Sequence, residues 1–303
     1  MAKADNTLER TIFFGKIDWK LKNKVVDVFD IFSKINNLSF ADGSRYYQAA
    51  DGQRYAILLD KLSSSRDTIY GCIGDSRITN LPFLEKQGSI TPLKIAKGEG
   101  IFDAMHFLIK KNSKGSWVVA YEFNFYAPRI GSINIYAHNK LSGYVDYVAI
   151  EPISGDPVSQ LLRKFKQIKK VRMRVHSGAD VRPLSVGLSA ALAAMRQAQD
   201  GVYIDIACSV GRSKDRVLSG DLIDNIPRFF KTMGPQSGME HFYISGIRSD
   251  TGQFDEADLM DIVLKERRHV ERIDKDYRFI NPQMMYAALT EAYNAQRHII
   301  DKV

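Results

Sequence analysis

The sequence contains little cysteine: Cys72 and Cys208 are the only two in 303 residues. Two cysteines cannot build the disulfide framework of a small secreted domain, so we expect a reducing compartment and a cytoplasmic protein. Long hydrophobic runs are also missing, because the uncharged stretch 184–195 is shorter than the roughly 18 residues of a membrane span. The charged N-terminus lacks the apolar region of a signal peptide. These absences predict a protein without membrane insertion.

Clustered metal ligands and nucleotide motifs are scarce as well. No two of the six histidines lie within one helical turn or one hairpin, whereas a zinc site usually shows a locally spaced ligand pair. A Walker phosphate loop is absent, and Gly98-Glu99-Gly100 lacks the third glycine of a dinucleotide fingerprint, since Asp103 stands there. We therefore expect no metal site and no cofactor, and each histidine is interpreted as a surface or hydrogen-bonded core residue.

The order of hydrophobic patterns predicts an α+β protein with two domains, 1–151 and 152–303. The first is expected to be a mainly antiparallel β-rich sheet with helices, and the second an α/β layered half. Asp51-Gly52, between β-rich runs, is typical of a hairpin turn. Pro152, Gly155 and Pro157 mark the boundary between the domains.

Individual elements follow from the same patterns. In the first domain we expect strands over 11–17, 45–50, 54–62, 67–74, 90–96, 117–126 and 132–137, with helices over 24–36 and 101–109. In the second we expect strands over 171–176, 202–208, 241–247 and 267–273, with helices over 158–169, 188–199, 255–264 and 282–300. Asn281-Pro282 opens the last helix with a cap and a first-turn proline.

The window 161–176 is the most informative segment, because it contains seven basic residues and no acidic residue: Arg163, Lys164, Lys166, Lys169, Lys170, Arg172 and Arg174. Its first part is expected to form a helix with the cations on one side. Its second part is expected to bury Val171, Met173 and Val175, which points Arg172 and Arg174 together with His176 to the other face. The result would be one basic surface across a helix and a strand.

Such a surface attracts the phosphates of DNA or RNA through counterion release, without selecting a sequence. Two other interpretations stay open. A basic helix is often only a solvated face. Binding to an anionic membrane surface is a further interpretation. It is disfavoured because the apolar side of the predicted helix has few bulky residues besides Phe165 to insert between lipids.

The loop Ser209–Lys214 follows a predicted strand and carries Arg212 and Lys214, so it is a candidate phosphate contact. Cys208 precedes it, but a cysteine phosphatase needs an arginine six positions after the cysteine, where this chain has Lys214. We therefore do not expect phosphatase chemistry. The loop is assigned to the nucleic-acid-binding surface instead.

The predicted 117–137 hairpin would display polar and tyrosine side chains on one face: Glu122, Asn124, Tyr126, Ser132, Asn134 and Tyr136. Tyrosines on such a face stack with unpaired bases or pack against a helix. Carboxylates for a metal-dependent nuclease would have to come from dispersed positions such as Asp60 and Glu122. Asp255, Glu256 and Asp258 are expected to begin a helix, where acidic residues favour the helix dipole.

Several short motifs are spread along the chain: Leu81-Pro82, Pro92-Leu93, Gly98-Glu99-Gly100, His106-Phe107, Glu122-Phe123-Asn124 through Pro128-Arg129, Phe242 to Gly246, Met285-Tyr286 and Tyr293. In this arrangement the chain resembles uncharacterised bacterial proteins encoded among anti-phage defence and mobile-element genes. The resemblance implies a prokaryotic cytoplasmic setting and a defence role. It assigns no catalytic residues.

The leading functional hypothesis is a cytoplasmic nucleic-acid-binding protein of bacterial defence, which contacts phosphates through the basic window with help from Arg212 and Lys214. One alternative is a metal-dependent nuclease with a dispersed carboxylate site. Another is an assembly subunit whose basic surface binds an acidic protein partner. Whether the protein is an enzyme, and whether it binds DNA or RNA, stays open at the level of sequence.

Overall fold

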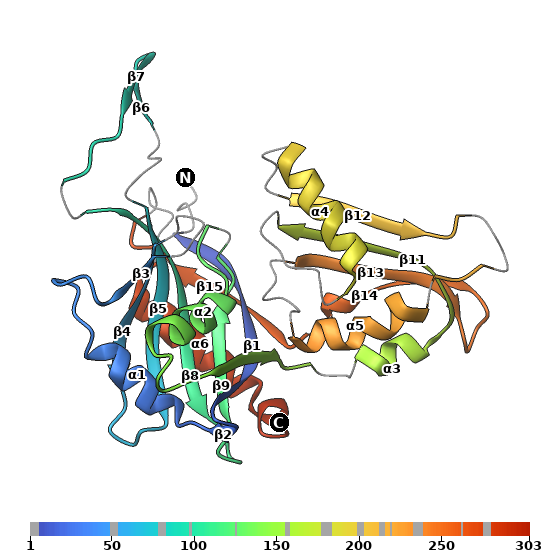
Figure 1. The fold of residues 1–303 in the computed structure, drawn as a ribbon, viewed down its shortest axis with the longest axis horizontal. Helices are drawn as coiled ribbons and strands as arrows, with labels where there is room; N and C mark the ends of the chain where they lie inside the picture. Colours follow the sequence, from blue (N-terminus) through green and yellow to red (C-terminus); the bar gives the residue numbers. More distant parts are fainter. Residues whose placement is uncertain are drawn as a thin grey trace. The chain divides into compact units, whose positions relative to one another are not determined.

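The computed structural model of the chain is shown in Figure 1. It describes residues 6–48, 54–77, 83–96, 99–124, 126–154, 158–176, 184–198, 203–211, 216–218, 220–232, 239–261, 263–274 and 280–303. The turn residues Asp51 and Gly52 lie outside these ranges. The strands on either side pair as an antiparallel hairpin would, with Gln48 opposite Arg54.

The chain divides into two compact units. The first consists of Met1–Ile12, Ile17–Ala149 and Glu266–Lys302, and the second of Phe13–Lys16 and Ile150–Lys265. The hydrophobic patterns of the sequence predict a division into 1–151 and 152–303. Residues 266–302 group with the first unit instead, because the strand that includes residues 266–271 pairs with the first strand of the chain and the helix that follows packs on the sheet of this unit.

The first unit is built on a mainly antiparallel sheet of order β10-β1-β9-β8-β5-β4-β3, in which β2 and β15 also pair with β1. The strands are β1 (Thr7–Leu21), β2 (Lys24–Val25), β3 (Tyr46–Gln48), β4 (Arg54–Leu62), β5 (Thr68–Arg77), β8 (Ile101–Lys111), β9 (Trp117–Glu122), β10 (Tyr147–Pro152) and β15 (Lys265–Glu271). A separate hairpin joins β6 (Phe83–Lys86) to β7 (Ser89–Pro92).

Helices cover both faces of this sheet (Figure 1). They are α1 (Val28–Asn36), α2 (Gly131–Lys140), α6 (Pro282–Ala295) and the short α7 (Arg297–Ile300). Phe32 of α1 packs on Phe107, with ring centroids 5.7 Å apart, while Tyr286 of α6 packs on the neighbouring His106 at 5.6 Å. Since successive strand residues point to opposite faces, β8 is buried on both sides.

Two expectations for the first unit are wrong. Residues 101–109 form strand β8 rather than a helix, because a strand buried on both faces has a continuous apolar run that periodicity cannot distinguish from a helix. Residues 132–137 form helix α2 rather than a strand. Ile133, Tyr136 and Ala137 are fully buried there, at the three- and four-residue spacing of a helix face.

The second unit contains an antiparallel sheet of order β12-β11-β13-β14. Its elements are α3 (Val158–Arg163), β11 (Phe165–His176), α4 (Val186–Ala198), β12 (Tyr203–Ser209), α5 (Gly220–Thr232), β13 (Met239–Arg248), β14 (Phe254–Asp258) and the 3-10 turn η2 (Leu259–Asp261). The helices lie on one face of this sheet (Figure 1). The expected α+β class is therefore confirmed, with an antiparallel sheet and helices in each unit.

The core of this unit lies between the sheet and its helices. Val171, Met173 and Val175 are at most 1% exposed and join one cluster with Phe229 and Phe242. The expected alternation of the strand part of the basic window is thus confirmed. The helix expected over 158–169 ends at Arg163, because β11 begins at Phe165 and pairs with β13 on one side and β12 on the other. The helix expected over 255–264 is instead β14 followed by η2.

Other local signals agree with the structure. Asn281 caps α6, since its side chain accepts a hydrogen bond from the backbone N–H of Gln283 at 3.0 Å, and Pro282 occupies the first turn. Both cysteines are free thiols. None of the helices in the described ranges combines the length and the apolar character that crossing a membrane requires.

Candidate nucleic-acid interface

The face of the second unit's sheet opposite its helices carries polar and aromatic side chains in cross-strand rows. Residues directly opposite one another in an antiparallel pair point to the same face. Arg174 of β11 stands between Asp205 of β12 and His241 of β13. In the next row, Arg172 stands opposite Tyr243, which is itself opposite Asp258 of β14. We call the side of the sheet that carries these rows the open face.

Two arginines dominate the open face. The side chains of Arg172 and Arg174 are 43% and 46% exposed. Arg174 donates two parallel hydrogen bonds to Asp205, from Nε at 3.0 Å and from Nη2 at 2.8 Å. These bonds, with the charges of Arg174, Arg172 and His241, hold the pKa of Asp205 below its ordinary value. Asp205 therefore fixes the plane of the Arg174 guanidinium.

Arg172 is held differently. Its Nη2 lies 3.7 Å from the nearest carboxylate oxygen of Glu256, which is longer than a hydrogen bond. Its guanidinium carbon lies 4.5 Å from the ring centroid of Tyr243. The Tyr243 ring in turn stacks with the His241 ring, at 5.3 Å between centroids and 22° between planes. Arg172, Tyr243 and His241 thus form one contiguous group of a guanidinium and two rings, which we call the platform.

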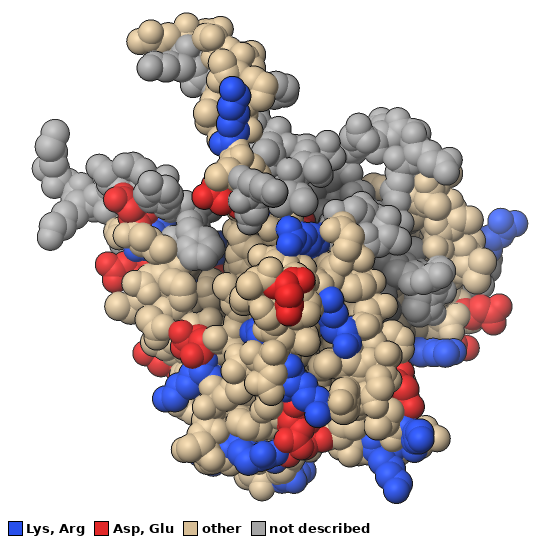
Figure 2. Space-filling view, turned by 60° about the vertical axis from the view of Figure 1, so that its left-hand side comes forward, with Lys and Arg blue, Asp and Glu red and all other residues tan. Residues whose placement is uncertain are grey.

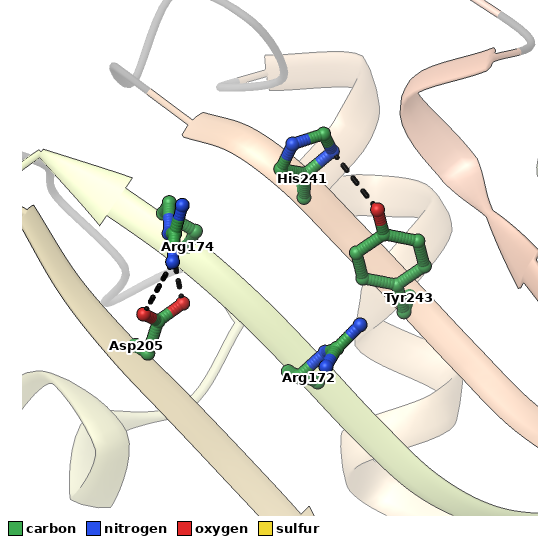
Figure 3. A pocket seen from close by; sticks show the side chains of 5 residues that line it. All are labelled: Arg172, Arg174, Asp205, His241 and Tyr243. Atoms are coloured by element: carbon green, nitrogen blue, oxygen red, sulfur yellow. Dashed lines mark hydrogen bonds and ion pairs between the residues drawn. The ribbon is translucent and has the colours of Figure 1, made fainter.

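These side chains surround a pocket of about 450 Å³, which is lined by Arg172, Arg174, Asp205, His241 and Tyr243 (Figure 3). Figure 3 shows that the lining comes from three adjacent strands, with Arg174 and Asp205 paired on one side and His241 and Tyr243 on the other. Cationic groups and flat surfaces within one pocket can hold a phosphate together with a planar ring.

The remaining cations of the basic window are distributed over more than one environment. Arg163 and Lys164 are exposed at the end of α3, and Lys166 is exposed near the start of β11. Lys170 is partly exposed, and its row partners are Ser209 and Ser245. The structure therefore replaces the expected helix–strand surface with a basic strand that follows a short helix.

Lys169 differs from the expectation. It is only 8% exposed, and its ammonium group donates a hydrogen bond to the backbone carbonyl of Arg216. A bulge in the pairing of β11 with β13, between Ile168 and Lys170, leaves both Ile168 and Lys169 buried. Lys169 is thus a structural cation. Arg212 and Lys214 lie outside the described residues.

The hairpin expected over 117–137 is wrong, because its second strand is part of helix α2. Tyr136 is fully buried, and its hydroxyl donates to the backbone carbonyl of Arg45 at 2.6 Å. Glu122 is also buried, at 2% exposure. Tyr136 therefore packs within the first unit, in agreement with the packing interpretation of these tyrosines and not with base stacking.

Sequence reasoning missed the partners of the two arginines. By its sequence neighbours alone His241 is a lone histidine, and the run with Glu256 and Asp258 predicts the start of a helix. A usable signal was present in β13, where His241, Tyr243 and Ser245 alternate with the buried Phe242 and Ile244. The cross-strand register that joins β13 to β11 cannot be obtained from that alternation alone.

The carboxylates suggested for a nuclease lie in the first unit. Asp60 of β4 accepts a hydrogen bond from Gln283 at 3.0 Å. Glu122 of β9 is held by His106 and lies 3.3 Å from Nε of Arg10. Within the described ranges, no three side chains of the His, Cys, Asp and Glu types are grouped as metal ligands would be.

Figure 2 shows one face of the molecule, on which basic and acidic side chains of the described residues are interspersed. The open face of the second unit combines two arginines with two stacked rings in one pocket. The sequence matches no known protein-family model and no curated protein.

Proposed function

We propose that the protein binds single-stranded nucleic acid on the open face of the second unit. One observation carries the proposal: Arg172 and Arg174 line the same pocket as the stacked rings of His241 and Tyr243. Arginine binds phosphate oxygens in a planar, two-pronged geometry, and rings and guanidinium planes stack with bases. A nucleotide presents both groups a short distance apart.

The orientation of the arginines supports phosphate binding. Asp205 accepts hydrogen bonds from Nε and Nη2 of Arg174 and so holds the guanidinium rigid. The Arg174 side chain nevertheless stays 46% exposed. Arg172 lies too far from Glu256 for a hydrogen bond to that carboxylate, and its guanidinium carbon lies over the Tyr243 ring, 4.5 Å from the centroid. A guanidinium that is already ordered loses less side-chain entropy when it binds a ligand.

The platform favours unpaired bases over a duplex. Bases inside a double helix stack on each other, and their flat faces are not accessible to protein side chains. A single strand exposes those faces, and each base stacked on an aromatic side chain contributes about 1–3 kcal/mol. We place this binding in the bacterial cytoplasm and in a defence role, on the strength of the free thiols and of the motif resemblance described above.

The test is fluorescence anisotropy with labelled single-stranded DNA and RNA at several salt concentrations. Arg172→Gln with Arg174→Gln should weaken binding at least about tenfold and lower the slope of log affinity against log salt by about one to two. Tyr243→Ala should weaken it by roughly 5- to 100-fold, as expected for the loss of one stacked base. Lys22→Gln with Lys24→Gln, two exposed lysines of the first unit, removes the same charge and should leave affinity unchanged.

Two outcomes would contradict the proposal. One is equal affinity of the wild type and the double arginine variant at low salt. The other is equally tight binding of polyglutamate, which carries charge but no bases and would indicate an acidic protein partner instead.

A further inference from the structure

His241 and Asp258 form a hydrogen-bonded pair at the pocket of the open face. His241 Nδ1 lies 2.8 Å from a carboxylate oxygen of Asp258, and the imidazole is 45% exposed while the carboxylate is 9% exposed. The other oxygen of Asp258 accepts the backbone N–H groups of Phe242 at 3.0 Å and of Met260 at 2.9 Å. The carboxylate is therefore fixed on the protein and in turn fixes the ring.

This arrangement determines which imidazole nitrogen is available for proton transfer. A carboxylate next to Nδ1 favours the tautomer that carries its proton there, with Nδ1 as the donor. The hydroxyl oxygen of Tyr243, 3.3 Å from the same nitrogen, also lies on this side of the ring (Figure 3). The second nitrogen, Nε2, then keeps its lone pair and acts as the basic atom.

The two arginines stand in the same pocket as this histidine. A phosphodiester bound between Arg172 and Arg174 would place its phosphorus near the imidazole. Fixed guanidinium groups stabilise the additional negative charge that develops on a phosphate when a nucleophile attacks it. A general base beside two such cations can promote cleavage of RNA without a metal ion.

We propose that the open face cleaves single-stranded RNA, with His241 as the general base and Asp258 as its positioning residue; this rests on the proposed function. His241 Nε2 removes the proton of a ribose 2′-hydroxyl, and the 2′ oxygen forms a bond to the adjacent phosphorus. The bond from phosphorus to the 5′ oxygen breaks, and that oxygen takes a proton from water. The protonated His241 then returns its proton to the hydroxide that remains.

The products are a 2′,3′-cyclic phosphate and a 5′-hydroxyl, and no metal ion or redox partner is consumed. The chemistry needs the 2′-hydroxyl, so a DNA strand binds the same face and stays intact. Titration with DNA therefore measures binding alone, and incubation with RNA measures binding followed by cleavage.

The experiment follows end-labelled RNA under single-turnover conditions, with protein in excess at a saturating concentration and EDTA present throughout. The expected result is cleavage to 2′,3′-cyclic phosphate ends, identified by mass spectrometry. His241→Gln should slow the saturated rate at least about 100-fold, the usual contribution of a general base. Asp258→Asn should lower the saturated rate without weakening the binding of DNA, because the substitution removes a negative charge and leaves the arginines in place. His269→Gln, an exposed histidine of the first unit, should cleave like the wild type.

Distinct outcomes overturn the two proposals. If DNA binds and RNA binds but stays intact, cleavage is refuted and the binding function stands. Equal rates for His241→Gln and the wild type, with both folded by circular dichroism, would also refute the role of His241. If neither strand binds, the proposed function fails and the cleavage proposal fails with it.

Discussion

Glu122 accepts two hydrogen bonds from a single residue, His106: one from the backbone N–H at 3.0 Å and one from Nδ1 of the ring. Both side chains are at most 3% exposed, and Nε of Arg10 lies 3.3 Å from the second carboxylate oxygen. The pair joins β8 to β9 beneath α6, in the interior of the first unit. Burying a charge costs several kcal/mol unless it is paired. The stability of this unit therefore depends on the contacts of Glu122 with His106 and Arg10.

Glu122→Gln should therefore destabilise the protein strongly. The substitution removes one charge and leaves Arg10 without its buried counterion, which typically costs about 3–5 kcal/mol of unfolding free energy. Urea unfolding measures the change. Glu9→Gln is the matched control, because Glu9 is 50% exposed and 3.8 Å from Arg267, and exposed pairs contribute less than about 1 kcal/mol. Equal effects of the two substitutions would contradict a structural role for the buried pair.

Asp205→Asn should strengthen nucleic-acid binding. The carboxylate lies on the open face beside both arginines, so its replacement takes a negative charge away from the phosphate position. The asparagine oxygen can still accept a hydrogen bond from Arg174, so most of the orientation of that guanidinium is kept. We expect roughly 2- to 10-fold tighter binding at low salt, with the difference shrinking as salt is added. Anisotropy titrations check this, with Asp261→Asn, an exposed carboxylate beyond β14, as the control. Weaker binding by Asp205→Asn would mean that orienting Arg174 matters more than the charge.

Gly246→Ala should destabilise the second unit. A Cβ atom at Gly246 would lie 2.0 Å from the backbone carbonyl oxygen of Gln167, at the bulge of β11, and neither backbone can move without disturbing the sheet. Such overpacking costs about 1–3 kcal/mol. Gly187→Ala in α4 is the control, because its nearest atom is 3.8 Å away and alanine favours a helix. A thermal melt in which both variants behave like the wild type would refute the close approach.

Acid should destabilise the second unit as its arginine-paired carboxylates are protonated. Hydrogen bonds from Arg248 lower the pKa of Asp250 from 3.8 to about 2, and also lower the pKa of Asp255. A carboxylate whose pKa is lower in the folded state binds fewer protons there than in the unfolded chain. Its contribution to stability is complete above 3.8 and is lost as the pH falls toward about 2. Urea unfolding across that window should show a shallower pH dependence for Asp250→Asn than for the wild type.

Cys72 should be unreactive in the folded protein. Burial, with a smaller effect of the Glu122 charge, raises the pKa of its thiol to about 12, so almost no thiolate exists at neutral pH. Cys208 is only partly buried. We expect Cys208→Ser to show no thiol that reacts with a disulfide reagent until urea is added, whereas Cys72→Ser should keep one. Rapid labelling of native Cys208→Ser would show that the interior beneath α6 opens readily.

Local patterns determined those parts of the fold whose signals lie within a few residues. The alternation of Val171, Met173 and Val175 correctly predicted a strand with one buried face, and Asn281-Pro282 correctly predicted the start of α6. The patterns failed where tertiary pairing overrides local preference. The run 104–109 is buried throughout, and apolar apart from His106, because helices cover both faces of β8, and local periodicity does not indicate that burial.

The residues of the candidate site also fall into those that local sequence patterns identify and those that depend on tertiary pairing. Arg172 and Arg174 could be identified from sequence, since charge density and period-two alternation are properties of one segment. Asp205, His241, Tyr243 and Asp258 could not, because their neighbourhood depends on the register of three strand pairs formed by residues far apart in the chain. Charge density and alternation within one segment thus identify the strand that carries the cations. The rings and carboxylates beside that strand depend on tertiary packing, because register is set by the packing of whole faces.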